Sequence, residues 1–186
     1  EARRDPNLFL LTADLGYRAL EPFQKEFPDR FINLGVAEQN MIGVATGLAI
    51  SGKHICVYSI VPFVTFRCFE QIRNNISHNN LNIKIIGVGG GFSYGDQGIS
   101  HNTTEDFAVM RTLPNFNILC PGDKIEAELV IKDMFKVSKP VYIRLGKAPN
   151  NSAYASIPKF KIGEGIIVKE GSDITLLSVG NIIENV

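Results

Sequence analysis

The chain has 186 residues, 19 basic and 19 acidic side chains, and a hydrophobic fraction of 45%. At this length one core can remove roughly 70% of the unfolded surface from water, so we expect one domain and a short appendage. A formal net charge of 0 argues against a nucleic-acid groove or a polybasic membrane patch. The longest nearly apolar stretch, 41–50, is about half of the roughly 20 residues that a bilayer crossing needs, and no signal-peptide pattern opens the chain. We therefore expect a cytoplasmic protein.

Short apolar runs alternate with segments of helical spacing along most of the chain. Runs without polar alternation are typical of strands covered on both faces. The predicted strands are 7–12, 31–34, 54–58, 83–88, 117–119 and 141–145, and the predicted helices are 17–26, 38–50, 63–77, 103–112 and 125–137. This alternation predicts an α/β fold with a doubly wound, mostly parallel sheet and helices on both faces. Ligands then gather beyond the carboxyl ends of the strands.

The composition changes after the last of these strands. We expect a first domain over 1–147, a linker over 148–172 that is rich in Asn, Ser, Lys, Gly and Pro, and the start of a truncated C-terminal domain over 173–186. The run "DITLLSVG" predicts one more buried strand, and "NIIENV" predicts a first helical turn. One strand cannot form a domain, which is why we expect the sequence to stop inside the next one.

The three cysteines, Cys56, Cys68 and Cys120, stand among apolar neighbours without CxxC spacing. This pattern indicates small buried side chains rather than a disulfide framework or a zinc site. With only three histidines and no clustered ligands, we expect no metal to be held by this chain alone.

Glu38 opens the apolar helix of the segment "RFINLGVAEQNMIGVATGLAISG". An acidic residue in the first turn is stabilised by the helix dipole without any ligand, so a structural role stays open. The helix that follows is apolar or small on every side, and we expect it to be buried. A partly desolvated carboxylate favours its protonated form, so Glu38 is a candidate for sharing a proton with a bound base.

Phe63, Phe66 and Phe69 recur at a spacing of three behind Pro62. Such a stripe is more often core than cofactor contact, because the three positions share one helix face. Phe63 is the exception that we consider. It stands at the helix start near the end of a strand, where a ring can stack on a flat heterocycle.

A glycine-rich run begins at Gly87 and leads to His101. It matches neither GxGxxG nor a Walker loop, so a nucleotide-phosphate site is weakly supported. Long glycine-hinged loops commonly contact substrates. A single histidine is usually structural, and catalysis by His101 is the alternative.

Together these segments resemble the transketolase family, specifically the central domain that holds the aminopyrimidine of thiamine diphosphate. The resemblance rests on four ordered motifs that span most of the chain, namely "LTADLG", "GVAEQNM", "FVTFRCFEQIRN" and "GDQGISHNTTEDFAVMRTLPNFNILCPGD".

The resemblance implies roles for individual residues. Glu38 hydrogen-bonds a pyrimidine nitrogen and favours the imino tautomer, whose nitrogen can take the proton from the thiazolium carbon. Phe63 stacks on the pyrimidine, with Phe66 as its competitor one helical turn away. Asp14 lies near the thiazolium, and His101 lies beside the reacting carbonyl.

Substrate contacts are less well defined by the resemblance. Arg144 is a candidate for a sugar phosphate, as is Lys147 with less specificity. Gln97 stands where the family often has an acidic residue, and the residues around His101 depart from the common Gly-Pro-Thr-His-Gln. These departures leave the choice of sugar open.

The family's Gly-Asp-Gly motif for magnesium and diphosphate is absent from the sequence. The resemblance therefore implies that thiamine diphosphate and Mg²⁺ are held partly by another domain or subunit. We expect a homodimeric enzyme that transfers a two-carbon ketol unit between sugar phosphates, and no catalysis by this piece alone.

Other functions remain open at this stage. Deoxyxylulose-phosphate synthases and the beta subunits of 2-oxoacid dehydrogenases share the motif order, although "EQIRN" favours a transketolase C-terminal section. A non-catalytic, flavodoxin-like assembly module, in which Glu38 only caps a helix, is the alternative from a different class.

Overall fold

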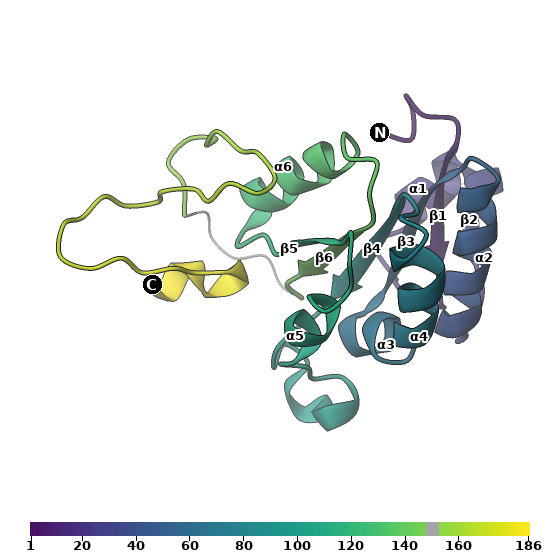
Figure 1. Ribbon diagram of the computed structural model, residues 1–186, viewed down its shortest axis with the longest axis horizontal. Coiled ribbons are helices and arrows are strands. Elements are labelled where there is room, and N and C mark those ends of the chain that lie inside the picture. Colours follow the sequence, from purple (N-terminus) through teal and green to yellow (C-terminus); the bar gives the residue numbers. More distant parts are fainter. Residues whose placement is uncertain (148–152) are drawn as a thin grey trace.

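The computed structural model describes residues 1–147 and 153–186 and is built on a six-stranded sheet (Figure 1). Every pairing in the sheet is parallel, and the strand order is β2-β1-β3-β4-β6-β5. The strands are β1 (Leu8–Thr12), β2 (Phe31–Asn33), β3 (His54–Ile60), β4 (Ile83–Val88), β5 (Asn117–Leu119) and β6 (Val141–Leu145). From β1 the chain turns to β2 on one side and then to β3 on the other, so a topological switch point lies at β1.

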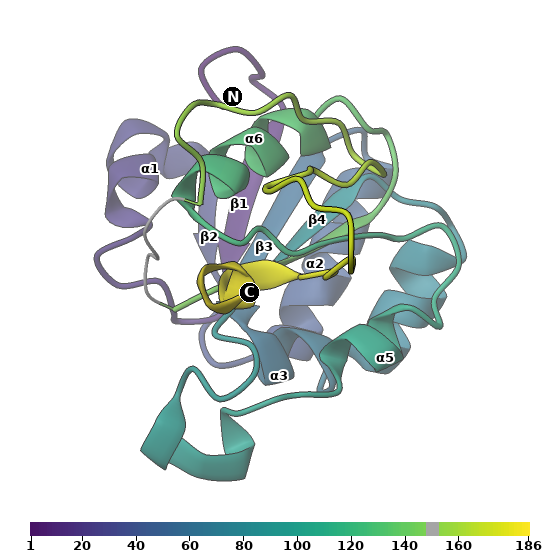
Figure 2. The same ribbon diagram turned by 90° about the vertical axis from the view of Figure 1, so that its left-hand side faces the viewer.

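Helices cover both faces of the sheet, as Figure 2 shows. The α-helices are α1 (Glu21–Glu26), α2 (Glu38–Ile50), α3 (Val61–Thr65), α4 (Phe69–Gln71), α5 (Asp106–Met110) and α6 (Lys124–Met134). Short 3₁₀ segments span Pro28–Arg30, Gly95–Ser100 and Gly180–Asn185, and a π-helical turn spans Ile72–Ser77. The predicted doubly wound α/β fold is confirmed.

Two hydrophobic clusters follow from the alternation of side chains along the strands. One cluster joins α2, α3 and α5 to one face of the sheet, and Leu11, Val57 and Ile85 are its central strand residues. The other joins α1 and α6 to the opposite face through residues such as Leu10 and Cys56. Complete burial of a large aliphatic side chain contributes about 1.5–3 kcal/mol, so these two layers account for the stability of the sheet.

Several helices are shorter than the sequence predicts. The helix predicted to start at residue 17 begins at Glu21, since Arg18 adopts a left-handed conformation with φ of 65° that a helix cannot include. The helix predicted over 63–77 is interrupted by a turn at 66–68. Arg67 lies in that turn.

Helix α2 is not buried on every side, contrary to expectation. Met41, Ile42 and Ala45 pack against the sheet, whereas Gly43 and Gly47 lie on an exposed face. A Cβ atom added at either glycine would meet nothing within 4 Å. The small residues therefore leave the backbone of α2 open to approach from outside this chain.

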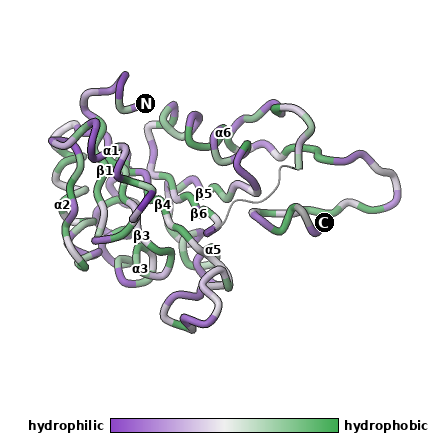
Figure 3. Tube along the Cα trace, turned by 180° about the vertical axis from the view of Figure 1, so that it is seen from behind, coloured by the Kyte–Doolittle hydropathy of each residue, from purple (hydrophilic) through white to green (hydrophobic). Residues whose placement is uncertain are grey.

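The buried strand predicted for 173–180 is absent from the described structure. Instead the segment is irregular and ends in the 3₁₀ turn at Gly180–Asn185. Its apolar side chains are exposed, with Leu177 at 93% and Ile174 at 78%. Figure 3 shows hydrophobic positions along this segment, which extends away from the sheet. A strand needs a neighbouring strand to pair with, and this segment pairs with none of the described strands.

Residues 153–172 contain turns and bends without a helix or strand, and part of this stretch lies against α6. Phe160 packs against the second hydrophobic cluster, and the Ile162 amide donates to Asp133 of α6. The first five residues of the predicted linker, 148–152, lie outside the described residues. The predicted domain boundaries stay predictions. Within the described parts of the chain, no helix has the length and hydropathy that a membrane span requires.

Candidate functional site

Glu38 lies at the base of an open cavity beyond the carboxyl end of β2. The residue is only 4% exposed and is the first residue of α2. The cavity has a volume of about 420 Å³ and is lined by Val36, Ala37, Glu38, Gln39, Asn40 and Arg67. The Glu38 carboxylate is therefore both nearly buried and part of the lining of a cavity of ligand size.

Arg67 connects Glu38 to an aromatic ring. Its Nη1 atom lies 3.3 Å and 3.4 Å from the two carboxylate oxygens of Glu38. Its guanidinium carbon lies 3.8 Å from the centroid of the Phe63 ring, which is a stacking distance. The side-chain amide of Gln39 donates through Nε2 to the Arg67 backbone carbonyl at 2.8 Å, which holds the backbone of the turn. The predicted carboxylate and the predicted ring therefore face the same guanidinium.

His101 reaches the same group of side chains from the glycine-rich loop. Its ring meets Phe63 edge to face, with centroids 5.0 Å apart, and lies 5.5 Å from the ring of Tyr94. Ser100 Oγ lies 2.9 Å from Nδ1 of His101. The Lys147 ammonium lies 4.4 Å from the centroid of the Tyr94 ring. A continuous series of contacts thus runs from Glu38 to Lys147.

Cys68 supports the backbone on which Phe63 stands. Its thiol donates to the carbonyl oxygen of Phe63 at 3.4 Å. Burial, and secondarily the nearby charge of Glu38, raises the pKa of the Cys68 thiol to about 12. The thiol therefore stays protonated and keeps its donor role at physiological pH.

Asp14 lies in the loop after β1 and is held by Asn33, the last residue of the neighbouring strand β2. Asn33 Oδ1 accepts from the amides of Asp14 and Gly35, and Asn33 Nδ2 donates to the Asp14 carboxylate at 3.2 Å. Tyr17 donates its hydroxyl to the same carboxylate at 3.2 Å. Asp14 has a φ of 56°, which these bonds sustain. Asn33 thus couples the Asp14 loop to the turn that leads into Glu38.

The glycine-rich run after β4 packs closely against two side chains. A Cβ at Gly89 would lie 2.1 Å from the Tyr94 ring, and one at Gly90 would lie 2.2 Å from Nε of Arg144. The loop is closed by paired hydrogen bonds between Gly91 and Thr103, at 2.6 Å and 2.9 Å. The space left by the missing side chains of Gly89 and Gly90 is therefore filled by Tyr94 and Arg144 of the same chain.

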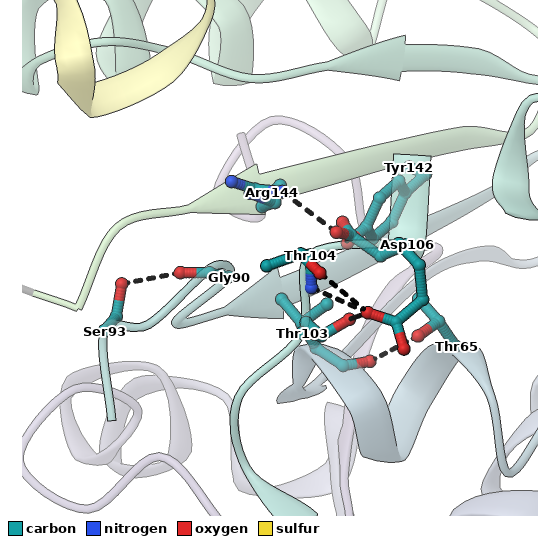
Figure 4. Close-up of polar contacts among 10 residues, drawn as sticks. Thr65, Gly90, Ser93, Thr103, Thr104, Asp106, Tyr142 and Arg144 are labelled. Carbon is teal, nitrogen blue, oxygen red and sulfur yellow. Dashed lines mark hydrogen bonds and ion pairs between the residues drawn. The ribbon is translucent and has the colours of Figure 1, made fainter. Parts of the chain in front are cut away.

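Arg144 belongs to a buried polar cluster at the base of this loop (Figure 4). Asp106 is 0% exposed and accepts from Arg144 Nη1 at 2.9 Å and from the Tyr142 hydroxyl at 2.7 Å. The guanidinium also lies 4.2 Å from the Phe107 ring centroid. Burial, and then the charge of Asp106, raises the pKa of Tyr142 well above its ordinary value. Arg144 is not a solvated surface charge, because its side chain is only 18% exposed.

The structure therefore brings together some predicted residues and separates others. Glu38, Phe63 and His101 share contacts, and Gln97 is exposed in the 3₁₀ segment of the His101 loop. Phe66 is half-buried in the turn at 66–68. The ring contacts favour Phe63 over it as the stacking residue.

Three residues of the site have no role in the sequence-based prediction, namely Arg67, Asn33 and Tyr94. The spacing of four between Phe63 and Arg67, which brings neighbours together on a helix, is the signal that points to Arg67. No comparable local signal exists for Asn33, because its partner Asp14 is 19 residues away.

The residues present fit a flat, nitrogen-containing ring. One buried carboxylate can bond a ring nitrogen, and Phe63 offers a face for stacking. For a metal-bound diphosphate the described residues offer less: in 1–147 and 153–186 no group of three His, Cys, Asp or Glu side chains is placed to hold an ion.

The doubly wound sheet thus places a buried carboxylate and a partly buried phenylalanine ring against the same guanidinium. The family model "Transketolase, pyrimidine binding domain" matches residues 1–151. The chain belongs to this family, as the sequence motifs predict.

The chain is similar to several known proteins. It is 40% identical over 177 residues to the putative transketolase C-terminal section of Methanocaldococcus jannaschii, covering 94% of this chain and 56% of that protein. It is 34% identical to an apulose-4-phosphate transketolase subunit of Phocaeicola vulgatus, covering 98% and 59%. A solved structure described as "Split gene transketolase, inactive beta4 tetramer" superimposes with a TM-score of 0.81 at 37% identity, covering 92% and 56%. The chain thus spans somewhat more than half the length of these relatives.

Proposed function

We propose that this chain is the pyrimidine-binding portion of a thiamine-diphosphate-dependent, transketolase-type enzyme that transfers a two-carbon ketol unit between sugar phosphates. The observation that carries the proposal is the Glu38 carboxylate, which is 4% exposed, lies in a cavity of about 420 Å³ and faces the same side chain as the Phe63 ring.

Each residue then has a defined task. Glu38 shares a proton with a nitrogen of the bound pyrimidine, and Phe63 orients that ring by stacking. Asp14, held by Asn33, places a negative charge beside the cationic second ring. Thiamine diphosphate, when bound, would supply a carbon acid whose conjugate base adds to carbonyl groups.

The loop after β4 provides the substrate contacts in this proposal. His101 donates to or accepts from the hydroxyl groups of the sugar, and exposed Gln97 selects among them. Lys147 and Arg144 provide cations for the sugar phosphate, and Lys147 is the exposed one of the two. The ion pair of Arg144 with Asp106 also keeps this loop in place.

The proposal requires a second polypeptide region that holds the diphosphate and Mg²⁺. Its support is that one relative is named as a transketolase subunit, another is named as a C-terminal section, and a solved relative is described as split-gene and as an inactive tetramer. We further propose that the assembled enzyme, meaning this chain with that region, contains two copies of this chain.

Glu38→Ala tests the central step. In the assembled enzyme we expect a loss of ketol-transfer activity of about 10²- to 10⁴-fold with unchanged circular dichroism. Glu70→Ala is the matched control, because Glu70 is an exposed carboxylate on α4. Equal activity of the two variants would favour a non-catalytic assembly module.

Substrate assays separate the related chemistries. The assembled enzyme should convert ketose phosphates in the presence of an aldose acceptor. Decarboxylation of pyruvate without such transfer would instead assign the chain to the synthase or dehydrogenase classes.

A further inference from the structure

The guanidinium of Arg67 occupies both contacts that the proposed function gives to the pyrimidine. It lies on the Phe63 ring at 3.8 Å, and its Nη1 atom bonds both oxygens of Glu38. Like an aminopyrimidine, a guanidinium is flat and presents N–H donors at its edge. One aromatic face and one carboxylate edge cannot hold two such groups in the same place.

The two ends of this interaction differ in freedom. The Glu38 side chain is 5% exposed, whereas the Arg67 side chain is 48% exposed. The distances of 3.3 Å and 3.4 Å exceed the roughly 2.7–2.9 Å of a tight charge-assisted bond. Arg67 also lies in the turn between α3 and α4, with its carbonyl held by Gln39. Its side chain can therefore move into solvent while the backbone stays in place.

We propose that Arg67 is an internal competitor of the pyrimidine: it stacks on Phe63 and pairs with Glu38 when the site is empty, and it must swing out when thiamine diphosphate binds. This inference rests on the proposed function. The half-exposed guanidinium partly neutralises the carboxylate of Glu38, so the pair stabilises the empty site by a modest amount. Binding of the ring exchanges one partner for another, and Arg67 thereby sets the affinity of the site.

Arg67→Met provides the first test, because methionine keeps an unbranched stem but has neither the charge nor the flat donor edge. In isothermal titration of the assembled enzyme with thiamine diphosphate and Mg²⁺, we expect the Kd to fall about threefold to tenfold. Arg67→Lys retains the charge without the flat fork and should give a smaller decrease. Arg73→Met, an exposed position whose guanidinium bonds Asn74, should leave the Kd unchanged. An unchanged or higher Kd in Arg67→Met would overturn the proposal.

Glu38→Ala in the same titration separates this inference from the proposed function. If that variant binds as tightly as the unmodified enzyme, the proposed function fails, and the competitor proposal fails with it. If Glu38→Ala loses binding while Arg67→Met does not gain it, only the role of Arg67 is wrong.

A cofactor-free measurement tests the stacked state directly. The Nε–H signal of Arg67, assigned by its loss in Arg67→Met, should show a ring-current shift that disappears in Phe63→Leu. Addition of thiamine diphosphate should move the same signal toward the position of an exposed arginine such as Arg73. A signal that Phe63→Leu leaves in place would contradict the stack.

Discussion

The molecule contains two buried carboxylates that each face an arginine lying on a phenylalanine ring. In the pair of Asp106 with Arg144 the bond is 2.9 Å long, and the two side chains are 0% and 18% exposed. In the pair of Glu38 with Arg67 the closest distance is 3.3 Å, and the arginine is 48% exposed. The guanidinium-to-ring distances are similar, at 4.2 Å and 3.8 Å.

The differences in distance and exposure indicate that the Asp106–Arg144 pair is structural and that the Glu38–Arg67 pair is exchangeable. Asp106 accepts from the Tyr142 hydroxyl as well as from Arg144, so both of its oxygens are paired inside the fold. Glu38 faces a cavity, and its partner can turn toward water. The first pair fixes the base of a loop, while the second offers an exchangeable contact at the proposed binding site. Variants of the two pairs should therefore differ in what they damage.

The largest effect on stability is expected from Asp106→Ala. Removing this carboxylate leaves Arg144 buried without its partner and the Tyr142 hydroxyl without its acceptor. The free energy of unfolding should fall by about 3–5 kcal/mol, as measured by urea denaturation. Glu38→Ala should cost about 1 kcal/mol or less, because Arg67 can become solvated. Equal losses in the two variants would remove the distinction between the pairs.

Lys84 is a buried basic residue whose ammonium group is paired with backbone carbonyls instead of a carboxylate. It is 2% exposed and donates to the carbonyls of Val137 and Lys139, and burial lowers its pKa to about 8 from the ordinary 10.5. The unfolded chain thus binds more protons between pH 8 and 10.5, so the contribution of Lys84 to stability should increase over that window.

The measurement compares the unmodified chain with Lys84→Met as a function of pH. The difference in unfolding free energy should shift in favour of lysine by up to about 3 kcal/mol between pH 8 and 10.5, with a slope of at most about 1.4 kcal/mol per pH unit. Because Cys56 and the tyrosines are common to both proteins, their titration largely cancels in the difference. A flat difference would mean that Lys84 is well solvated when charged.

Glycine substitutions compare the tightly packed loop after β4 with the exposed face of α2. Gly90→Ala places a Cβ against Arg144 and should destabilise the chain by about 1–3 kcal/mol. Gly43→Ala lies on the open face of α2 and should stabilise it by about 0.5–1 kcal/mol through helix propensity. Thermal unfolding of both variants should show a lower melting temperature for Gly90→Ala and a higher one for Gly43→Ala. A lower melting temperature for Gly43→Ala would show that this face of α2 is covered in the isolated chain.

The smallest effect is expected from Arg67→Met in the absence of ligand. The half-exposed arginine should contribute about 0.2–1 kcal/mol to stability. Raising the ionic strength from 0.1 M to 1 M should reduce that contribution, since exposed charges are screened. A salt-independent loss above 2 kcal/mol would indicate a buried pair like that of Asp106.

Much of the fold follows from local patterns in the sequence. Leu8, Phe9, Leu10 and Leu11 of β1 are apolar at consecutive positions, which is typical of a strand covered on both faces, so the parallel sheet is predictable. Helix ends are less predictable, since the left-handed Arg18 and the turn at 66–68 depend on tertiary packing. The strand predicted at 173–180 shows that apolar character alone is insufficient without a neighbouring strand.

The candidate site is predictable only where its residues lie in recognisable motifs. Glu38, Phe63 and His101 lie in such motifs, and the structure places them in mutual contact through Arg67 and the Phe63 ring. Arg67 by itself resembles an ordinary surface arginine in the sequence. The bond from Asp106 to Tyr142 joins residues 36 positions apart, and no periodicity reports a contact over that separation.

Both outer strands of the sheet, β2 and β5, contain three residues each. So short an edge gives an incoming strand few backbone groups to pair with, which disfavours growth of the sheet by strand addition. Association with another polypeptide is then favoured at helix surfaces and loops, where side chains rather than backbone hydrogen bonds decide which partner is accepted.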